Sequence, residues 1–239
     1  MERIQQGYTN KSFRDGKFFY QEKNYTGFNH HLDYSLLTQF SFVPRLIANQ
    51  REFSKWEYID GSVPEMSEQN LKQIAQHLNT LHLSKLKFPA NNLVARINHY
   101  LAIIKQKHLP RADLPHIFQL KTQIFDFLAQ NQNIWPLHND LWPINLVEDS
   151  HHQIYFVDWE YATMGDIHFE LAYFIEASKL NLQQETFLLT HFDSINQQRL
   201  IQNKIIVNYL VVLWALAQIQ LPFEIEQYLK KIDKLNELL

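Results

Sequence analysis

The 239-residue sequence contains no cysteine and only five glycines, and each shortage excludes a class of chemistry. Without cysteine the protein forms no disulfide, holds no zinc through thiolates and uses no cysteine nucleophile, and its composition fits a reducing compartment. None of the glycines forms the phosphate-binding pattern Gly-x4-Gly-Lys-Ser/Thr, the dinucleotide pattern Gly-x-Gly-x-x-Gly or the hydrolase pattern Gly-x-Ser-x-Gly. P-loop enzymes, Rossmann enzymes and serine hydrolases with that elbow are therefore without support.

A strong charge of either sign and a long apolar run are also missing. The net charge of −3 and the isoelectric point near 6.4 indicate no basic surface for nucleic acid or an anionic membrane. The longest apolar stretch, residues 205–217, is too short to cross a bilayer comfortably, and we expect a buried helix there. The N-terminus lacks the apolar core of a signal peptide. We therefore expect a cytoplasmic globular protein with neither a nucleic-acid nor a membrane partner, and the sequence indicates no oligomeric state.

The most informative segment of the chain is a predicted β-hairpin in its middle. Residues 145–148 and 154–157 are apolar, strand-like runs, and the turn-forming residues 149–152 separate them. Folding the hairpin about the middle of that turn places Asn145 opposite Asp158. Directly opposed residues have Cβ atoms about 4.5–5.5 Å apart. The amide oxygen and the carboxylate are therefore expected to share one hard cation such as Mg²⁺.

Residues just before the hairpin complete a candidate catalytic group. Asp140 lies five residues before Asn145, on a tight loop that contains Pro143. Its carboxylate is expected beside the metal, where it accepts a proton from an attacking hydroxyl. His138 is expected to orient this loop through a hydrogen bond. Each residue alone is more often a cap or a turn residue, so the prediction rests on the ordered set.

This ordered set resembles the catalytic loop and the metal-binding aspartate of protein-kinase-like phosphotransferases. Here Asp158 is followed by Trp-Glu-Tyr-Ala rather than by Phe-Gly. That variant is similar to the superfamily of choline and ethanolamine kinases, thiamine kinases and aminoglycoside phosphotransferases. The resemblance implies a two-lobed α+β fold, with a small N-terminal lobe built on an antiparallel sheet and a larger, mostly helical C-terminal lobe. We place these lobes at residues 1–60 and 61–239.

The resemblance also implies where ATP binds. Residues 7–13 resemble the nucleotide loop of choline-kinase-like enzymes, and residues 56–61 resemble the connector between the lobes, whose backbone meets the adenine ring. The residues expected to contact the nucleotide are Thr9, Asn10, Lys11, Lys23, Glu57 and Tyr58. Residues 71–82 match the first helix of the large lobe, and their apolar positions have helical spacing.

One position of the small lobe departs from the family pattern. The strand after the nucleotide loop usually carries a lysine or arginine that holds the α- and β-phosphates, and here that position is Gln21. Lys23 lies two residues further on the same strand face and is our candidate substitute, with Lys17 as the alternative. The departure motivates a second hypothesis, a catalytically weak kinase-like protein that binds a nucleotide as a regulator. The intact catalytic and metal-binding set argues against that hypothesis.

Aromatic and acidic residues indicate the acceptor. Trp142, Tyr161 and Trp214 offer ring faces to a cationic head, each contact worth about 0.5–2 kcal/mol, and Glu160 adds negative charge. For Trp214 a packed core position is the alternative. We predict transfer of the γ-phosphate of ATP to a hydroxyl of a choline-, ethanolamine- or thiamine-like acceptor. Aminoglycoside phosphorylation is the alternative within the same fold, and the sequence leaves ATP or GTP open.

Overall fold

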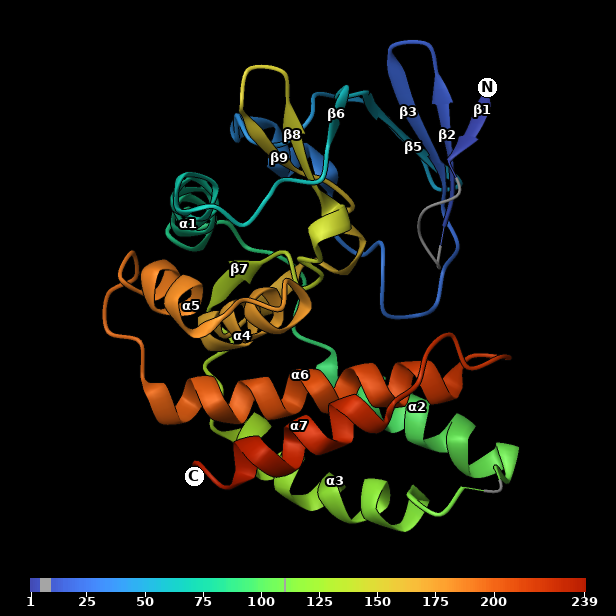
Figure 1. Cartoon of the computed structure of the whole chain (residues 1–239). Coiled ribbons are helices and arrows are strands. Elements are labelled where there is room, and N and C mark those ends of the chain that lie inside the picture. Colours follow the sequence, from blue (N-terminus) through green and yellow to red (C-terminus); the bar gives the residue numbers. More distant parts are fainter. Residues whose placement is uncertain (5–9, 110) are drawn as a thin grey trace.

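The computed structural model describes residues 1–4, 10–109 and 111–239. Its N-terminal part is an antiparallel five-stranded sheet in the order β1-β2-β3-β5-β4 (Figure 1). The strands are β1 (Glu2–Ile4), β2 (Lys11–Asp15), β3 (Phe18–Glu22), β4 (Leu46–Asn49) and β5 (Phe53–Glu57). Gly16 makes the tight turn between β2 and β3 at φ +61°, a conformation that glycine adopts without strain.

Two smaller sheets carry the segments on either side of the catalytic motif. The strands β6 (Gly61–Ser62), β8 (Leu146–Asp149) and β9 (Ile154–Phe156) form one sheet, and β7 (Trp135–Leu137) pairs with β10 (Thr163–Gly165). β6 can approach β8 only because residue 61 is glycine: a Cβ there would lie 2.2 Å from the backbone oxygen of Glu148. This contact ties the segment that follows the first sheet to the hairpin.

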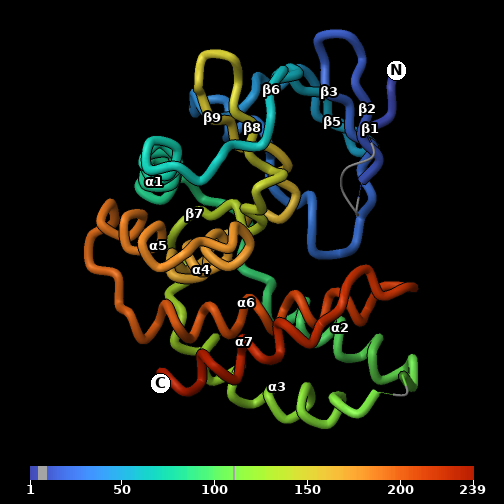
Figure 2. Tube along the Cα trace, viewed as in Figure 1, coloured from blue at the N-terminus to red at the C-terminus, as the bar shows by residue number. Residues whose placement is uncertain are grey.

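The rest of the molecule is helical (Figure 2). The α-helices are α1 (Glu68–His82), α2 (Leu93–Lys107), α3 (Leu114–Ala129), α4 (Ile167–Ala177), α5 (Leu182–Leu189), α6 (Gln197–Ala217) and α7 (Glu226–Asn236). Short 3₁₀ helices are η1 (Tyr34–Gln39), η2 (Pro143–Asn145) and η3 (Trp159–Tyr161). An antiparallel N-terminal sheet followed by a mostly helical C-terminal part confirms the predicted fold class.

Helix α6 forms the centre of the helical part. It packs against α2, α3, α4 and α7, and from Ile205 onward it is apolar on nearly all sides apart from Asn208, as an enclosed helix is. Within the described ranges it is the one helix long and apolar enough to cross a membrane, yet 83% of its most apolar stretch is buried inside the molecule. The prediction of a buried helix over residues 205–217 is thus confirmed.

The β8–β9 hairpin has a register that differs by one residue from the predicted one. Leu146 pairs with Phe156 rather than with Val157. The backbone carbonyl of Asn145 accordingly accepts a hydrogen bond from the Val157 amide, at 2.9 Å. The predicted pairing of Asn145 with Asp158 is therefore wrong.

The turn of the hairpin explains this shift. The Asp149 carboxylate accepts hydrogen bonds from the amides of His151 and Gln153, at 2.8 and 2.9 Å. The Asp149 amide donates to the Gln153 carbonyl at 3.0 Å, so the loop closes one residue earlier than in the predicted register, which would put Asp149 opposite Ile154. The side chain of a turn aspartate therefore selects the register.

His77 of α1 gives a prediction about stability. Its ring lies 4.5 Å from Phe42 and 5.6 Å from Phe156, centroid to centroid, and burial lowers its pKa from 6.5 to about 4. The neutral ring therefore contributes its full stability above pH 6.5, and that contribution is lost as the pH falls toward 4. We expect His77→Phe to reduce the acid-induced fall in the free energy of unfolding, measured by urea denaturation between pH 7 and 4.5. His116→Phe, at a partly exposed histidine, is the control, and an unchanged pH dependence in His77→Phe would contradict the prediction.

Candidate active site

Two adjoining cavities contain the residues of the catalytic motif. The first has a volume of about 440 Å³ and the second a volume of about 480 Å³. Five residues line both cavities and so form their common wall: Ser12, Gln21, Ile144, Asn145 and Asp158. The two predicted metal ligands therefore lie where a group could pass from one cavity to the other.

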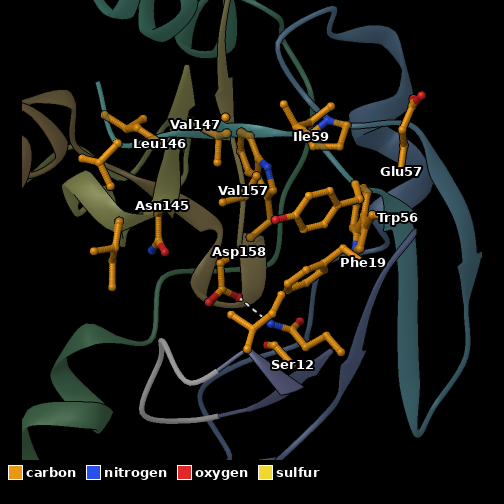
Figure 3. Close-up of a pocket in the computed structure, with 18 of the residues that line it drawn as sticks. Ser12, Phe19, Trp56, Glu57, Ile59, Asn145, Leu146, Val147, Val157 and Asp158 are labelled. Carbon is orange, nitrogen blue, oxygen red and sulfur yellow. Dashed lines mark hydrogen bonds between the residues drawn. The ribbon is translucent and has the colours of Figure 1, made fainter. Parts of the chain in front are cut away.

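The first cavity, called the slot below, is largely apolar. Figure 3 shows Phe19 and Trp56 on one side and Leu146 and Val147 on the other, with Asn145 and Asp158 at one end. Such a slot could take a planar ring, and its carboxylate end could take the phosphates of a nucleotide only with a cation between the two negative groups.

Two backbone amides of the connector, at the rim of this cavity, already donate hydrogen bonds within the protein. The Glu57 amide donates to the Arg45 carbonyl at 2.8 Å, and the Tyr58 amide donates to the Lys17 carbonyl at 2.9 Å. Ile59, the next residue, also lines the cavity. The backbone amides of Glu57 and Tyr58 hold the connector in place, so a purine ring would meet carbonyl groups of the connector or the Ile59 amide.

The catalytic loop begins after β7, and buried polar groups fix its shape. Asn139 has a left-handed backbone (φ 63°), and its amide donates to the Glu170 carboxylate at 2.8 Å. The other oxygen of this fully buried carboxylate lies 2.8 Å from His82 Nε2. Helices α1 and α4 thereby fix the backbone immediately before Asp140. His82 is a buried residue near the end of α1.

His138 connects the loop to the end of the hairpin. Its Nε2 lies 2.9 Å from the Val157 carbonyl oxygen, so this nitrogen carries the proton, and its ring packs 4.5 Å from that of Trp159. Burial lowers the pKa of His138, which keeps the ring neutral. The geometry is that of a residue that orients the loop by hydrogen bonding.

Asp158 faces the common wall although the hairpin register differs from the prediction. It leaves the strand with a left-handed backbone (φ 62°, ψ 62°), a conformation in which aspartate and asparagine are enriched among non-glycine residues. Burial and the nearby Glu160 and Asp140 charges raise the pKa of Asp158 to about 8. Gln21 Nε2 donates to Asp158 Oδ1 at 3.1 Å, the dashed line in Figure 3.

The donor set at the common wall fits Mg²⁺. Asn145 Nδ2 donates to the Asp140 carbonyl at 2.7 Å and to Asp140 Oδ2 at 3.2 Å, which leaves the Asn145 amide oxygen for a cation. The raised pKa of Asp158 marks a carboxylate that lacks a compensating positive charge. In the ranges that the structure describes, no three His, Cys, Asp or Glu side chains form a metal site. Two protein oxygens suit an ion that takes its other ligands from water and phosphate.

The profile of the Phosphotransferase enzyme family matches residues 27–193, more than half of the chain. The chain belongs to this phosphotransferase family. It is 42% identical over 231 residues to a LicA homologue of Mycoplasma capricolum, covering 96% of this chain and 95% of the relative. The structure of choline kinase LicA from Streptococcus pneumoniae matches with a TM-score of 0.78 at 19% identity, over 99% of this chain and 92% of that chain. Spectinomycin phosphotransferase APH(9)-Ia, in complex with ADP and spectinomycin, matches with a TM-score of 0.65 at 13% identity, over 98% and 88%. The family resemblance and the assignment as a phosphotransferase with an alcohol acceptor are confirmed.

The predicted nucleotide ligands of this phosphotransferase have different placements. Thr9 lies outside the described residues. Asn10 lines the second cavity, whereas the Lys11 side chain lies 4.0 Å from Glu22 and is exposed. Among the described residues, Lys11 is not one that lines either cavity.

Lys23 lines neither cavity among the described residues, although its ammonium group lies 5.1 Å from the ring centroid of Tyr34, which lines the first. Its ammonium group donates to Asn49 Oδ1 at 2.6 Å and to the Gln50 carbonyl at 2.8 Å, near the turn between β4 and β5. Burial lowers its pKa. Two basic side chains, Arg96 and Lys179, line the second cavity. Among the described residues, no lysine or arginine lines the first.

The second cavity is lined by aromatic residues, some of which were missed by the sequence analysis. Trp142, Tyr161 and Trp214 were predicted there, and Tyr173, Phe223 and Tyr228 join them. The Trp214 and Phe223 rings stack at 6.1 Å, and Phe223 lies 5.5 Å from Tyr228. The loop after α6 and helix α7 supply these last two residues, and no local motif in the sequence marks either of them.

Arg96 and Glu160 are two of the charged residues that line this cavity. The Arg96 guanidinium lies 4.3 Å from the Tyr161 ring centroid, and its Nε donates to the Tyr100 hydroxyl at 3.2 Å. Glu160 accepts a hydrogen bond from Asn29 Nδ2 at 2.6 Å, and burial raises its pKa to about 7. The Arg96 charge would repel a cationic head, whereas the Trp214 and Phe223 rings could make cation–π contacts with it.

Proposed function

We propose that this phosphotransferase transfers the γ-phosphoryl group of ATP to the hydroxyl of a small amino alcohol of the choline or ethanolamine type. One observation carries the proposal: Asp140, Asn145 and Asp158 lie together where an apolar slot meets an aromatic cavity. ATP in the slot and an acceptor in the second cavity would bring the two reacting groups to this junction. ATP supply and the absence of cysteine support a cytoplasmic location as part of the proposal.

The residues at the junction have distinct proposed tasks. Asp140 accepts the hydrogen bond of the acceptor hydroxyl, orients it toward the γ-phosphorus and takes its proton. Asn145 and Asp158 hold Mg²⁺, which when bound neutralises charge on the β- and γ-phosphates. Catalysis then rests mainly on position and electrostatics, as in other phosphoryl transfers.

The aromatic residues of the second cavity support a cationic acceptor. Cation–π contacts with tryptophan are the strongest of their kind, and Trp214 of α6 stacks with Phe223 of the loop that follows this helix. LicA of Streptococcus pneumoniae, which has the same fold, is described as a choline kinase. A thiamine-like acceptor also carries both a cationic ring and a primary hydroxyl, and so belongs in the same test.

A panel of acceptors tests this proposal directly. Purified protein with ATP and Mg²⁺ would be assayed for ADP release with choline, ethanolamine, thiamine and spectinomycin. We expect an amino alcohol to give the highest kcat/KM. Turnover of spectinomycin alone would instead support the aminoglycoside alternative, and nucleotide binding without turnover of any acceptor would support the regulator hypothesis.

Trp214 gives a prediction about acceptor affinity. Trp214→Leu keeps an apolar side chain but removes the ring face, so we expect the KM of a cationic acceptor to rise roughly 2–30-fold, the equivalent of one cation–π contact. The KM of ATP should stay the same, because Trp214 lines the second cavity alone. An equal rise in both KM values would indicate a general disturbance of the fold and contradict the assignment.

A further inference from the structure

We propose that Tyr173 is a positioning residue for Asp140 and that Trp142 fixes the direction of its hydrogen bond. The inference rests on the proposed phosphoryl transfer and deepens it, since it names how the carboxylate is held before the acceptor arrives. Tyr173 lies on α4, and both aromatic residues line the second cavity together with Asp140.

The direction of each hydrogen bond follows from the chemistry of the donors. The Tyr173 hydroxyl lies 2.6 Å from Asp140 Oδ1, and Trp142 Nε1 donates to the Tyr173 oxygen. An indole nitrogen donates only, so the phenol oxygen must accept from Trp142. The single proton of the phenol is then available to donate to Asp140. If this proton rotated away from the carboxylate, it would face the N–H of the indole, which is an unfavourable contact between two donors.

The second oxygen of Asp140 also has a donor. Asn145 Nδ2 lies 3.2 Å from Oδ2, so both carboxylate oxygens are held and the plane of the carboxylate is fixed. An acceptor hydroxyl can then approach only a defined lone pair. Holding a reacting group within a narrow range of angles is a large source of rate in such reactions.

The properties of Tyr173 suit this task. The side chain is 5% exposed, and burial together with the Asp140 charge raises its pKa well above the ordinary value. The phenol therefore stays protonated and remains a donor. Hydrogen bonds to a carboxylate are shorter and stronger than neutral ones, in keeping with the short distance to Asp140.

Removal of single polar atoms tests the proposal. Tyr173→Phe deletes the hydroxyl and keeps the ring, and we expect kcat to fall about 10–100-fold, the effect of one hydrogen bond to a charged group. Trp142→Phe removes the indole donor and should lower kcat less. Because Trp142 acts through the Tyr173 hydroxyl, the double variant should be no slower than Tyr173→Phe alone. The KM of ATP should not change in any of the three variants.

Tyr209→Phe is the matched control. Tyr209 is a fully buried tyrosine of α6 whose hydroxyl donates to the Ile117 carbonyl at 3.0 Å, and it lines neither cavity within the described ranges. It loses one buried hydrogen bond, as Tyr173→Phe does, so it should lose stability while keeping its kcat. A kcat for Tyr173→Phe equal to that of wild type would overturn the proposal, and so would additive effects of the two single variants.

The role of Tyr173 can also be tested without turnover, so its failure is distinguishable from failure of the proposed function. If wild type turns over none of the acceptors, that function fails. The unfolding free energies of Tyr173→Phe, Asp140→Asn and the double variant then still decide the inference. A coupling between the two substitutions supports the held carboxylate, and strict additivity overturns it.

Discussion

Replacement of Asp140 by asparagine is expected to lower kcat by roughly 10²–10⁴-fold, the usual contribution of a positioned base. The substitution keeps the shape of the side chain but removes its charge, so the acceptor hydroxyl loses the group that orients it and takes its proton. Asp140 lines the second cavity and not the slot proposed for ATP. Nucleotide affinity should therefore stay near that of wild type, as measured by titration calorimetry.

Asp126→Asn is the control for this experiment, because Asp126 is exposed on α3 and the change has the same chemistry. Its turnover should match that of wild type. Equal turnover by Asp140→Asn and wild type would remove Asp140 from its catalytic assignment. Loss of nucleotide binding together with turnover would point to a damaged fold instead.

The sequence was informative about the site where the chemistry depends on local spacing. Asp140 and Asn145 lie on one short loop that includes η2, so their proximity follows from the chain itself. The structure shows this directly, since Asn145 Nδ2 bonds both to the Asp140 carbonyl and to its carboxylate. Residues that are close in sequence need little tertiary information to be placed.

The hairpin shows how a correct placement can follow from a wrong register. A shift of one residue normally moves every side chain of a strand to the opposite face. Asp158 escapes this rule because it lies beyond the end of β9 and turns back with a left-handed backbone. The capping of the turn by Asp149 and the left-handed residue depend on backbone details that apolar patterns do not reveal.

The prediction for Lys23 met a similar limit. The Lys23 amide donates to the Glu52 carbonyl at 2.9 Å, which continues the register that pairs Glu22 with Phe53, so alternation still puts Lys23 on the face of Gln21. Its ammonium group instead binds Asn49 and the Gln50 carbonyl, and the spacing of residues along β3 does not reveal these contacts with the turn between β4 and β5. Phe223 and Tyr228 were missed because only the packing of α6 against α7 brings them to the cavity.

Gln21 has a consequence for the charge of the nucleotide. It occupies the strand position at which the family usually has a cation, and it donates a neutral hydrogen bond to Asp158. No lysine or arginine of the described chain lines the first cavity. The charge of phosphates that lie in the first cavity would then be met mainly by the metal ion, so the proposed enzyme should depend strongly on its two metal ligands.

Asp158→Asn is accordingly expected to raise the Mg²⁺ concentration needed for half-maximal activity and to lower activity by more than about 100-fold. Even partners in the outer shell of metal ligands change affinity or activity by about 10–100-fold, and Asp158 is a proposed direct ligand. Asparagine is the informative replacement because it tolerates the left-handed backbone at φ 62°. Alanine would add a backbone cost of roughly 1–2 kcal/mol and so mix strain with the loss of charge.

Activity measured over a range of Mg²⁺ concentrations separates the metal role from a structural one. A metal ligand predicts partial recovery of Asp158→Asn at high Mg²⁺, since mass action offsets weaker binding. Asp60→Asn is the control, because Asp60 lies near the first cavity on the connector and is highly exposed. A loss of activity in Asp158→Asn with no change in the Mg²⁺ midpoint would contradict the metal assignment. The hydrogen bond from Gln21 would then be the reason that this carboxylate matters.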